Sequence, residues 1–491
     1  MQDRYGYQRA SDLKSFVEAH QAGLTSTYTP TPLDHIYIKL DFALEYENAR
    51  TAEDAKRFLR SIARAAEAAQ LLAQQCGGAL FEVQGSTLHV ALQRGNGLND
   101  SSVNDNALTF VAALHQAFKS LFPEGHTRVD GWRMTVDSGK TLVVSGRGVH
   151  DDDSWVSLGK AANRPAKELY RQLSKPEADR RLQRFHVGVR HPVTGAWSYS
   201  SLDTLPVRLE DARSTGEAIR KSEPQIDFRA GMRRVMADAA PIAPGGSPLA
   251  PSPDKPYVYF GWVLRADLDG FTRRVQDCLD DDDRLQELAD EFAEIMEAAA
   301  DFVRDHETVT MAQLPWAGDN FTVAAVYRSK DEYEKASATK LAELPVDFDK
   351  EMGLSMPRST FNGWAHGVAG GDVHGNAGGN VYLGGIQIGQ RRFLVGAGEG
   401  FGRSTQAFGD INPETGEVVV FMPDHDRLAD DYKADFGPAT NQRGQTSTLF
   451  RLSSTKELAR TYARSRVDGF PTVVTVAAGV QRPVDNRPYF K

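Results

Sequence analysis

The sequence has little cysteine, no long apolar run and no excess of positive charge. Only two cysteines, Cys76 and Cys278, occur in 491 residues, and they match no CxxC or zinc-ligand spacing. A disulfide framework or a structural zinc site is therefore not expected, and both cysteines are interpreted as packing residues. No stretch approaches the ~18 unbroken apolar residues of a membrane span, and the start, MQDRYGYQRASDLKSF, lacks the apolar core of a signal peptide. We expect a cytoplasmic protein without a membrane partner.

The charge balance narrows the partners further. The net charge is -9 at pH 7, and 41% of the residues are hydrophobic and 25% charged. A general nucleic-acid binder would need a basic face to neutralise phosphates, so no nucleic-acid partner is expected. The composition is that of a globular chain large enough for two or three domains.

One composition shift divides the chain. Residues 237–256, ADAAPIAPGGSPLAPSPDKP, are rich in Ala, Pro, Gly and Ser and show neither helical nor strand periodicity. We interpret this segment as a linker. It predicts an N-terminal extension at 1–34, a first domain at 35–236, a second domain at 257–424 and a C-terminal extension at 425–491.

The same order of features occurs on both sides of the linker. In the first half the pattern predicts a strand at 35–43 and then a helix at 51–75 that Thr51 caps. A hairpin at 79–92 around Gly85 and a helix at 107–122 follow. A second hairpin is predicted at 132–146, around Asp137, Ser138 and Gly139. In the second half it predicts a strand into VLRADLDGFT (263–272), an amphipathic helix at 285–304, a hairpin at 310–327 around Gly318, and a strand within 359–376. This order predicts an α+β fold in both halves, with helices on one face of a mainly antiparallel sheet.

Two carboxylates occupy special places in the second half. Asp267 ends the apolar strand, and Asp319 follows the glycine at the bend of the hairpin. The two strands are expected to be neighbours in the sheet, so the carboxylates should converge. Oxygen ligands of this kind suit hard divalent cations such as Mg²⁺ or Mn²⁺, which accept nucleotide phosphates as further ligands.

These motifs resemble the class III nucleotidyl cyclases. VLRADLDGFT looks like the first metal motif of that family, and WAGDNFTVA (316–324) is similar to its Gly-Asp hairpin. RMTVDSGKTLVV (133–144), followed by VSLGKAANRPAKEL (156–169), looks like the strand and helix that carry the family's Asn. Diguanylate cyclases and other palm domains share the first Asp and the hairpin but not the Asn helix, which favours the class III family.

The resemblance implies two ferredoxin-like (βαββαβ) cyclase domains in an intramolecular pseudo-heterodimer, without a need for a second chain. In the first half Asp41 matches the first metal position, but the hairpin reads Gly85-Ser86 and lacks the second carboxylate. In the second half both carboxylates are present, but Gly400 stands where the first half has Asn163. Family sites take metals from one domain and Asn from the other, so one working site and one dead site are expected.

The resemblance also assigns roles around the metals. Asp267, Asp319 and the backbone carbonyl of Leu268 would hold two Mg²⁺ or Mn²⁺ ions. Asn163 would orient the ribose in the transition state. Lys167, one helical turn further and on the same face, stands where the family usually has Arg; it would meet the α-phosphate without Arg's bidentate fork, and Arg164 is the alternative donor.

Base choice depends on two family positions, which here are Glu82 and Val156. A carboxylate accepts hydrogen bonds, so Glu82 suits guanine N1–H or uracil N3–H and disfavours adenine and cytosine. A buried acceptor without a donor costs about 1–3 kcal/mol, which is enough to discriminate. Val156 offers no polar partner and fits a smaller base, and Tyr46 could narrow the pocket against purines.

The resulting hypothesis is a uridylate cyclase that converts UTP to 3',5'-cyclic UMP and pyrophosphate, similar to the pyrimidine cyclases of Pycsar antiphage defence, with a product-binding effector protein as partner. A guanylate or adenylate cyclase in ordinary signalling is the alternative within the class. A catalytically silent nucleotide-binding sensor is the alternative outside it.

Overall fold

The computed structural model describes residues 8–22, 27–42, 49, 51–94, 105–124, 129–147, 153–173, 184–227, 260–268, 271–305, 310–327, 335, 364–370, 381–398, 400–401, 418–421, 436–440 and 446–452. The described residues up to 227 are called the first half below, and those from 260 onward the second half. The linker, Tyr46 and the tail beyond 452 lie outside the described residues.

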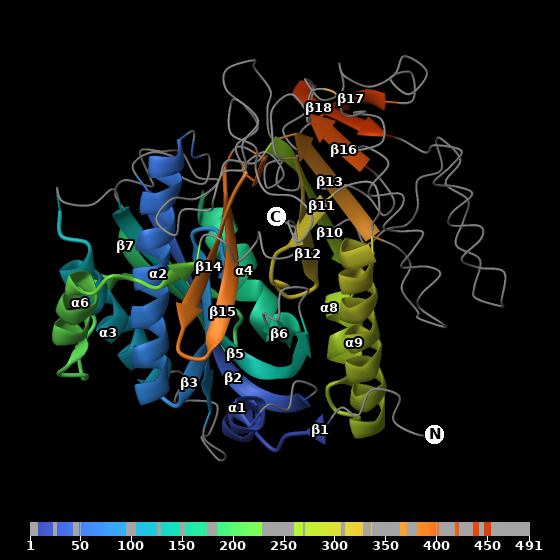
Figure 1. Cartoon of the computed structure of the whole chain (residues 1–491). Coiled ribbons are helices and arrows are strands. Elements are labelled where there is room, and N and C mark those ends of the chain that lie inside the picture. Colours follow the sequence, from blue (N-terminus) through green and yellow to red (C-terminus); the bar gives the residue numbers. More distant parts are fainter. Residues whose placement is uncertain are drawn as a thin grey trace.

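The first half contains one large, mainly antiparallel sheet (Figure 1). Its strands follow the order β3 (Gly78–Gln84), β4 (Thr87–Gln93), β2 (Thr27–Phe42), β5 (Val129–Arg147), β7 (Phe185–Arg190) and β8 (Trp197–Ser201), with β1 (Gln8–Arg9) beside β2 and β6 (Asp153–Leu158) beside β5. The helices are α1 (Leu13–Gln21), α2 (Ala52–Gln75), α3 (Asp105–Leu121), α4 (Lys160–Leu173) and α6 (Ala212–Lys221), with a 3-10 turn, η2, at Leu202–Thr204.

The second half repeats this strand order. Its sheet runs β11 (Thr310–Gln313), β12 (Asn320–Tyr327), β10 (Phe260–Leu268), β13 (Trp364–Gly370), β16 (Val418–Phe421), β18 (Thr446–Leu452) and β17 (Phe436–Thr440). In both sheets the hairpin pairs with a central strand, the next strand is antiparallel to it, and the one after that is parallel. The repeat predicted from the sequence is thus confirmed at the level of strand order.

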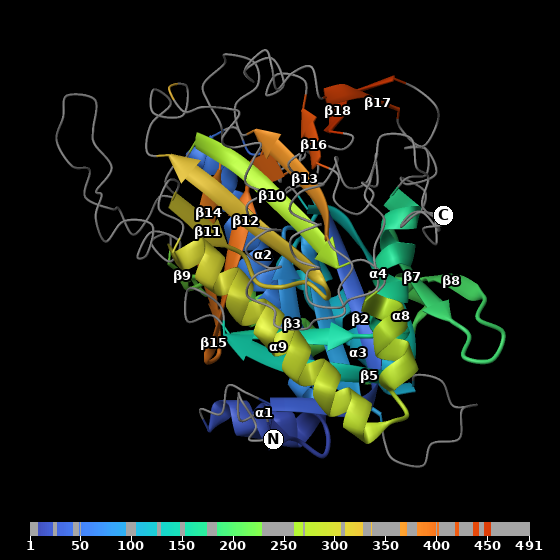
Figure 2. The ribbon, with the colours of Figure 1, turned by 90° about the vertical axis from the view of Figure 1, so that its right-hand side faces the viewer.

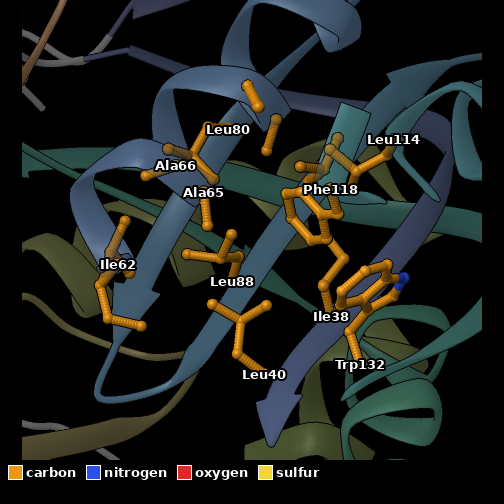
Figure 3. Packing of buried hydrophobic residues seen from close by; sticks show 14 of the residues in the cluster. Ile38, Leu40, Ile62, Ala65, Ala66, Leu80, Leu88, Leu114, Phe118 and Trp132 are labelled. Atoms are coloured by element: carbon orange, nitrogen blue, oxygen red, sulfur yellow. The ribbon is translucent and has the colours of Figure 1, made fainter. Parts of the chain in front are cut away.

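The long helices form where the sequence places them. The hydroxyl of Thr51 accepts a hydrogen bond from Asp54 N at 3.1 Å, and Glu53 and Asp54 add negative charge to the first turn of α2, which favours the positive end of the helix dipole. Figure 3 shows the apolar face of α2 packing over the sheet. The buried residues there are Ile62, Ala65 and Ala66 of α2, Leu114 and Phe118 of α3, and Ile38, Leu40, Leu80, Leu88 and Trp132 of the strands.

Each half covers a long helix of the other. A third sheet, β15 (Arg391–Ala397), β14 (Tyr382–Ile388) and β9 (Ile226–Asp227), packs on α2 (Figure 1). A Cβ on Gly384 would lie 2.9 Å from Leu59 of that helix. In the opposite direction β5 packs on α9 (Asp282–Asp305), which follows the short α8 (Phe271–Cys278) (Figure 2). A Cβ on Gly146 would lie 2.4 Å from Met296 of α9. The halves therefore interlock through reciprocal contacts.

Two expectations about the strands of the first half are wrong. Residues 132–146 do not form a hairpin around Asp137; they belong to the continuous strand β5, whose ladder with β2 runs through Asp137, Ser138 and Gly139. The carboxylate of Asp137 pairs with Arg164 and Arg190 from neighbouring elements. β2 begins at Thr27, not near His35, and its prolines, Pro30 and Pro32, are accommodated in the ladder with β5.

Cys76 and Cys278 are both buried and form no disulfide, as packing residues should, and burial raises the pKa of the Cys76 thiol to about 11. Among the described helices none is long and apolar enough to cross a membrane.

Candidate functional site

The hairpin of the second half places a buried carboxylate next to the end of β10. Gly318 adopts a positive φ of 61°, a conformation that favours glycine, and Asp319 follows it with 6% of its surface exposed. β10 and β12 are neighbours as predicted, and Asp267 lies opposite Asn320 in the ladder. The backbone therefore brings Asp267 next to Asp319. Of Asp267 and Leu268 the structure describes the backbone, with Leu268 opposite Trp364.

The environment of Asp319 disfavours a bare negative charge. Burial is the main cause that raises its pKa to about 6; its own backbone N–H and the charge of Lys167 oppose the rise, and the charge of Glu82 adds to it. Its Oδ2 atom is buried without a hydrogen-bond partner among the described residues. A buried carboxylate oxygen left in this way is costly unless a cation meets it.

The donor atoms at this position fit a hard divalent cation. Such ions prefer carboxylate oxygens and complete their coordination with water or phosphate oxygens, and the buried oxygen of Asp319 is of that type. Within the described residues no group of three or more His, Cys, Asp or Glu side chains could hold a metal. The fit therefore depends on Asp319 together with Asp267.

Helix α4 of the first half brings Asn163 to this hairpin. The preceding Gly159 has a φ of 130°, and Asn163 N donates to its carbonyl at 3.1 Å. The amide nitrogen of Asn163 hydrogen-bonds to the hydroxyl of Thr272 in α8. Its amide oxygen is 3.7 Å from the position that a Cβ would take on Gly318. Asn163 thus contacts the second half at the two segments that flank the carboxylates.

The two basic residues near Asn163 have different surroundings. Lys167 lies close enough to Asp319 for its charge to lower the pKa of that carboxyl. Arg164 instead pairs with the buried Asp137, its Nε 2.7 Å from Oδ2. Burial raises the pKa of Asp137 and the charge of Arg164 opposes the rise. Of the two residues, Lys167 is the one whose charge acts on the hairpin carboxylate.

Glu82 also faces the hairpin. It is 5% exposed, and its Oε1 accepts a hydrogen bond from Gly318 N at 3.3 Å. Nδ1 of His89 lies 3.5 Å from the same oxygen. The His89 ring stacks on Tyr37, with centroids 4.2 Å apart, and its Nε2 is 3.0 Å from Nδ1 of His35. Glu82 therefore stands at the end of a row of buried rings and meets the hairpin across the interface.

Val156 lies on the same face of β6 as Ser154, which makes a second contact with the hairpin. It is fully buried, and it shares a strand face with Ser154, two residues away. The hydroxyl of Ser154 accepts a hydrogen bond from Trp316 N at 3.4 Å. Asn163, Lys167, Glu82 and Val156 all come from the first half, and all lie toward the Gly318 hairpin of the second.

The equivalent position in the first half is filled by an ion pair. Asp41 at the end of β2 is bound by Arg133 of β5, with one contact of 2.9 Å between Nε and Oδ2, and the hydroxyl of Ser86 accepts a hydrogen bond from Lys39. Arg133 is 3% exposed, so a buried guanidinium neutralises the carboxylate of Asp41. The sequence shows that Ser86 stands where a second carboxylate is missing. It does not show that Arg133 pairs with Asp41, because these two residues come from strands far apart in the chain.

Comparison with known proteins shows the fold. No family model and no curated protein sequence matches this chain. Among solved structures, a class III adenylyl cyclase-like ATP-binding protein from Pseudomonas aeruginosa matches with a TM-score of 0.60 and 15% identity, over 89% of this chain and 91% of that one. The adenylyl cyclase CyaB from P. aeruginosa matches with a TM-score of 0.29 and 12% identity, over 41% of this chain and 97% of that one. The last similarity is too low to support an argument, and the first shows that this chain has the class III cyclase-like fold over most of its length.

Proposed function

We propose that the protein is a nucleotidyl cyclase with one active site between its halves, an intramolecular pseudo-heterodimer. One observation supports this most strongly: Asn163 and Glu82 of the first half meet the Gly318-Asp319 hairpin of the second. The second site of such an arrangement would be inactive, since Arg133 holds Asp41 there.

The carboxylates define where the triphosphate would bind. Asp319, with Asp267 opposite its neighbour in the ladder, would hold Mg²⁺ or Mn²⁺, and the backbone carbonyl of Leu268 would complete the set. When bound, these cations supply a lowered pKa for the ribose 3'-hydroxyl and charge neutralisation for the triphosphate. The buried, unpaired oxygen of Asp319 fits this role.

The first half would supply the groups that orient the reacting atoms. Asn163 would hold the ribose so that its 3'-oxygen faces the α-phosphorus, and Lys167 would place positive charge on the α-phosphate, with Arg164 as the alternative donor. The bond from the 3'-oxygen to phosphorus forms as the bond from phosphorus to the β-phosphate bridging oxygen breaks. Pyrophosphate leaves, and the 3'-hydroxyl proton passes to solvent.

For the base we propose uracil, so that UTP gives cyclic UMP. Glu82 would accept from uracil N3–H, and the buried Val156 would favour a small base; Tyr46 would add to the exclusion of purines. The biological role would then be that of a Pycsar-type antiphage signal, with an effector protein that binds the product. GTP presents a comparable donor and is the next candidate.

Activity and two substitutions test the proposal. Purified protein with Mn²⁺ should convert one nucleoside triphosphate to its cyclic monophosphate, identified by mass spectrometry. D319A and N163A should each abolish or nearly abolish product, while R9A, which removes an exposed ion pair with Asp282 between the halves, should retain activity. Equal activity in D319A and the unmodified protein would refute the metal assignment.

A silent nucleotide-binding sensor is the second candidate. A solved structure with the same fold is named as an ATP-binding protein, and nucleotide binding by this chain would be consistent with that name. Calorimetry combined with product analysis distinguishes the two functions. A sensor would bind a nucleoside triphosphate and Mn²⁺ in the calorimeter, and mass spectrometry would find the nucleotide intact after prolonged incubation.

A further inference from the structure

Strand β3 contains a β-bulge directly before Glu82. The ladder with β4 pairs Leu80 with Val90 and then Glu82 with His89, so Phe81 is an extra residue. In a bulge two consecutive residues oppose one residue of the partner strand, which interrupts the alternation of side chains between the two faces.

This bulge decides which face of the sheet Glu82 takes. Regular pairing would place Glu82 opposite Leu88, whose side chain belongs to the apolar core under α2 and α3. Residues opposite each other in a ladder share a face, so Glu82 would then point into that core. With the bulge, Val83 lies opposite Leu88 in the core, and Glu82 lies opposite His89 on the face toward the second half.

A residue of the second half holds the bulged backbone. Arg391, the first residue of β15, donates from Nη1 to the carbonyl of Leu80 and from Nη2 to that of Phe81 at 2.9 Å. Its guanidinium carbon is 3.7 Å from the ring centroid of Trp155 and 4.6 Å from that of Phe393. The planar fork of Arg reaches two adjacent carbonyls while its flat face stacks on aromatic rings, which Lys cannot reproduce.

The aromatic support of Arg391 extends to the N-terminal helix. Trp155 packs edge-on against Phe81, with centroids 5.7 Å apart, and against Phe16 and His20 of α1 at 5.5 and 5.0 Å. The bulge is thus held between a guanidinium from the second half and a ring that α1 buttresses.

We infer that Arg391 is a positioning residue that keeps Glu82 on the face of the nucleotide site by holding the β3 bulge. Base selection would therefore depend on the docking of the β14–β15 hairpin onto the first half. The inference rests on the proposed function, in which Glu82 reads the base.

The test compares R391A and R391K with R9A as a matched control, because Arg9 also crosses between the halves but is exposed and far in the sequence from β3. For each variant kcat/KM is measured with UTP, GTP, CTP and ATP. R391A and R391K should lower the preference for the favoured nucleotide about 10-fold, the effect of losing one hydrogen bond to the base. R9A should keep the preference.

In an E82Q background R391A should change the preference little, because both substitutions act on one interaction.

A purely structural role for Arg391 would lower kcat/KM equally for all four nucleotides, and an unchanged preference in R391A would overturn the inference. Backbone hydrogen exchange at 78–84 gives a reading without nucleotide: it should become faster in R391A and stay unchanged in R9A. If the unmodified protein neither binds nor converts any nucleotide, the proposed function fails and base selection by Glu82 fails with it. Faster exchange in R391A would then still support the hold on the bulge, and unchanged exchange would refute that as well.

Discussion

The buried carboxyl of Asp319 should make the free energy of unfolding depend on pH. Its pKa is raised from 3.8 to about 6 in the folded protein, chiefly by burial. Between these two values the folded state holds a proton that the unfolded state has released, so the free energy of unfolding falls as pH rises through this window. One pKa unit corresponds to about 1.4 kcal/mol, so without metal the cost is about 3 kcal/mol above pH 7, and roughly half of it has developed by pH 5.

The substitution D319N removes this titration at nearly the same volume. In EDTA the variant should be more stable than the unmodified protein by a margin that grows with pH to about 3 kcal/mol above pH 7, measured by urea unfolding from pH 4.5 to 7.5. Saturating Mn²⁺ should stabilise the unmodified protein, by about 2.7 kcal/mol at 100 times Kd, and stabilise D319N much less. D130N, at an exposed position of β5, serves as the control. A margin between D319N and the unmodified protein that is constant with pH would show that Asp319 does not titrate in this window.

Three further predictions concern single side chains. N163A should lower kcat by about 100-fold or more, the usual effect of removing one group that acts in the transition state, with little change in nucleotide binding by calorimetry; an equal loss of affinity would contradict its role. E82Q, which adds a donor, should shift preference from UTP toward CTP about 10-fold in kcat/KM competition, and an unchanged ratio would remove Glu82 from base reading. R133M should lower the free energy of unfolding by about 2–4 kcal/mol, because it leaves the partly buried carboxylate of Asp41, 28% exposed, without its cationic partner. The double substitution of D41N with R133M should recover most of this loss in urea unfolding.

Local signals in the sequence were sufficient for the elements that carry the site. Gly85 and Gly318 mark hairpins because both need a positive φ, observed at 54° and 61°. Thr51 with an acidic first turn marks the start of α2. The neighbouring strands β10 and β12 follow from the hairpin order, and the sequence alone therefore predicts that the backbone brings Asp267 and Asp319 close together.

The remaining features depend on contacts between distant segments. Asp137, Ser138 and Gly139 have the composition of a turn, yet Asp137 is paired with Arg164 and Arg190 and the strand continues. The bulge at Phe81 has no glycine in the sequence that would indicate it. Its backbone is held by Arg391, which lies far along the chain. The first of these contacts lies within the first half and the second joins the two halves, and neither has a signal in the local sequence.

In the proposed function, Asn163 of the first half and Asp319 of the second complete one cyclase site. The most direct measurement is incubation of the purified protein with Mn²⁺ and each of ATP, GTP, CTP and UTP in turn, with products identified by mass spectrometry and the same done for N163A and D319A. We predict one predominant cyclic mononucleotide, with pyrophosphate in equal amount, and the loss of this product in both variants. No cyclic product from any of the four nucleotides, or a product that survives both substitutions, would contradict it.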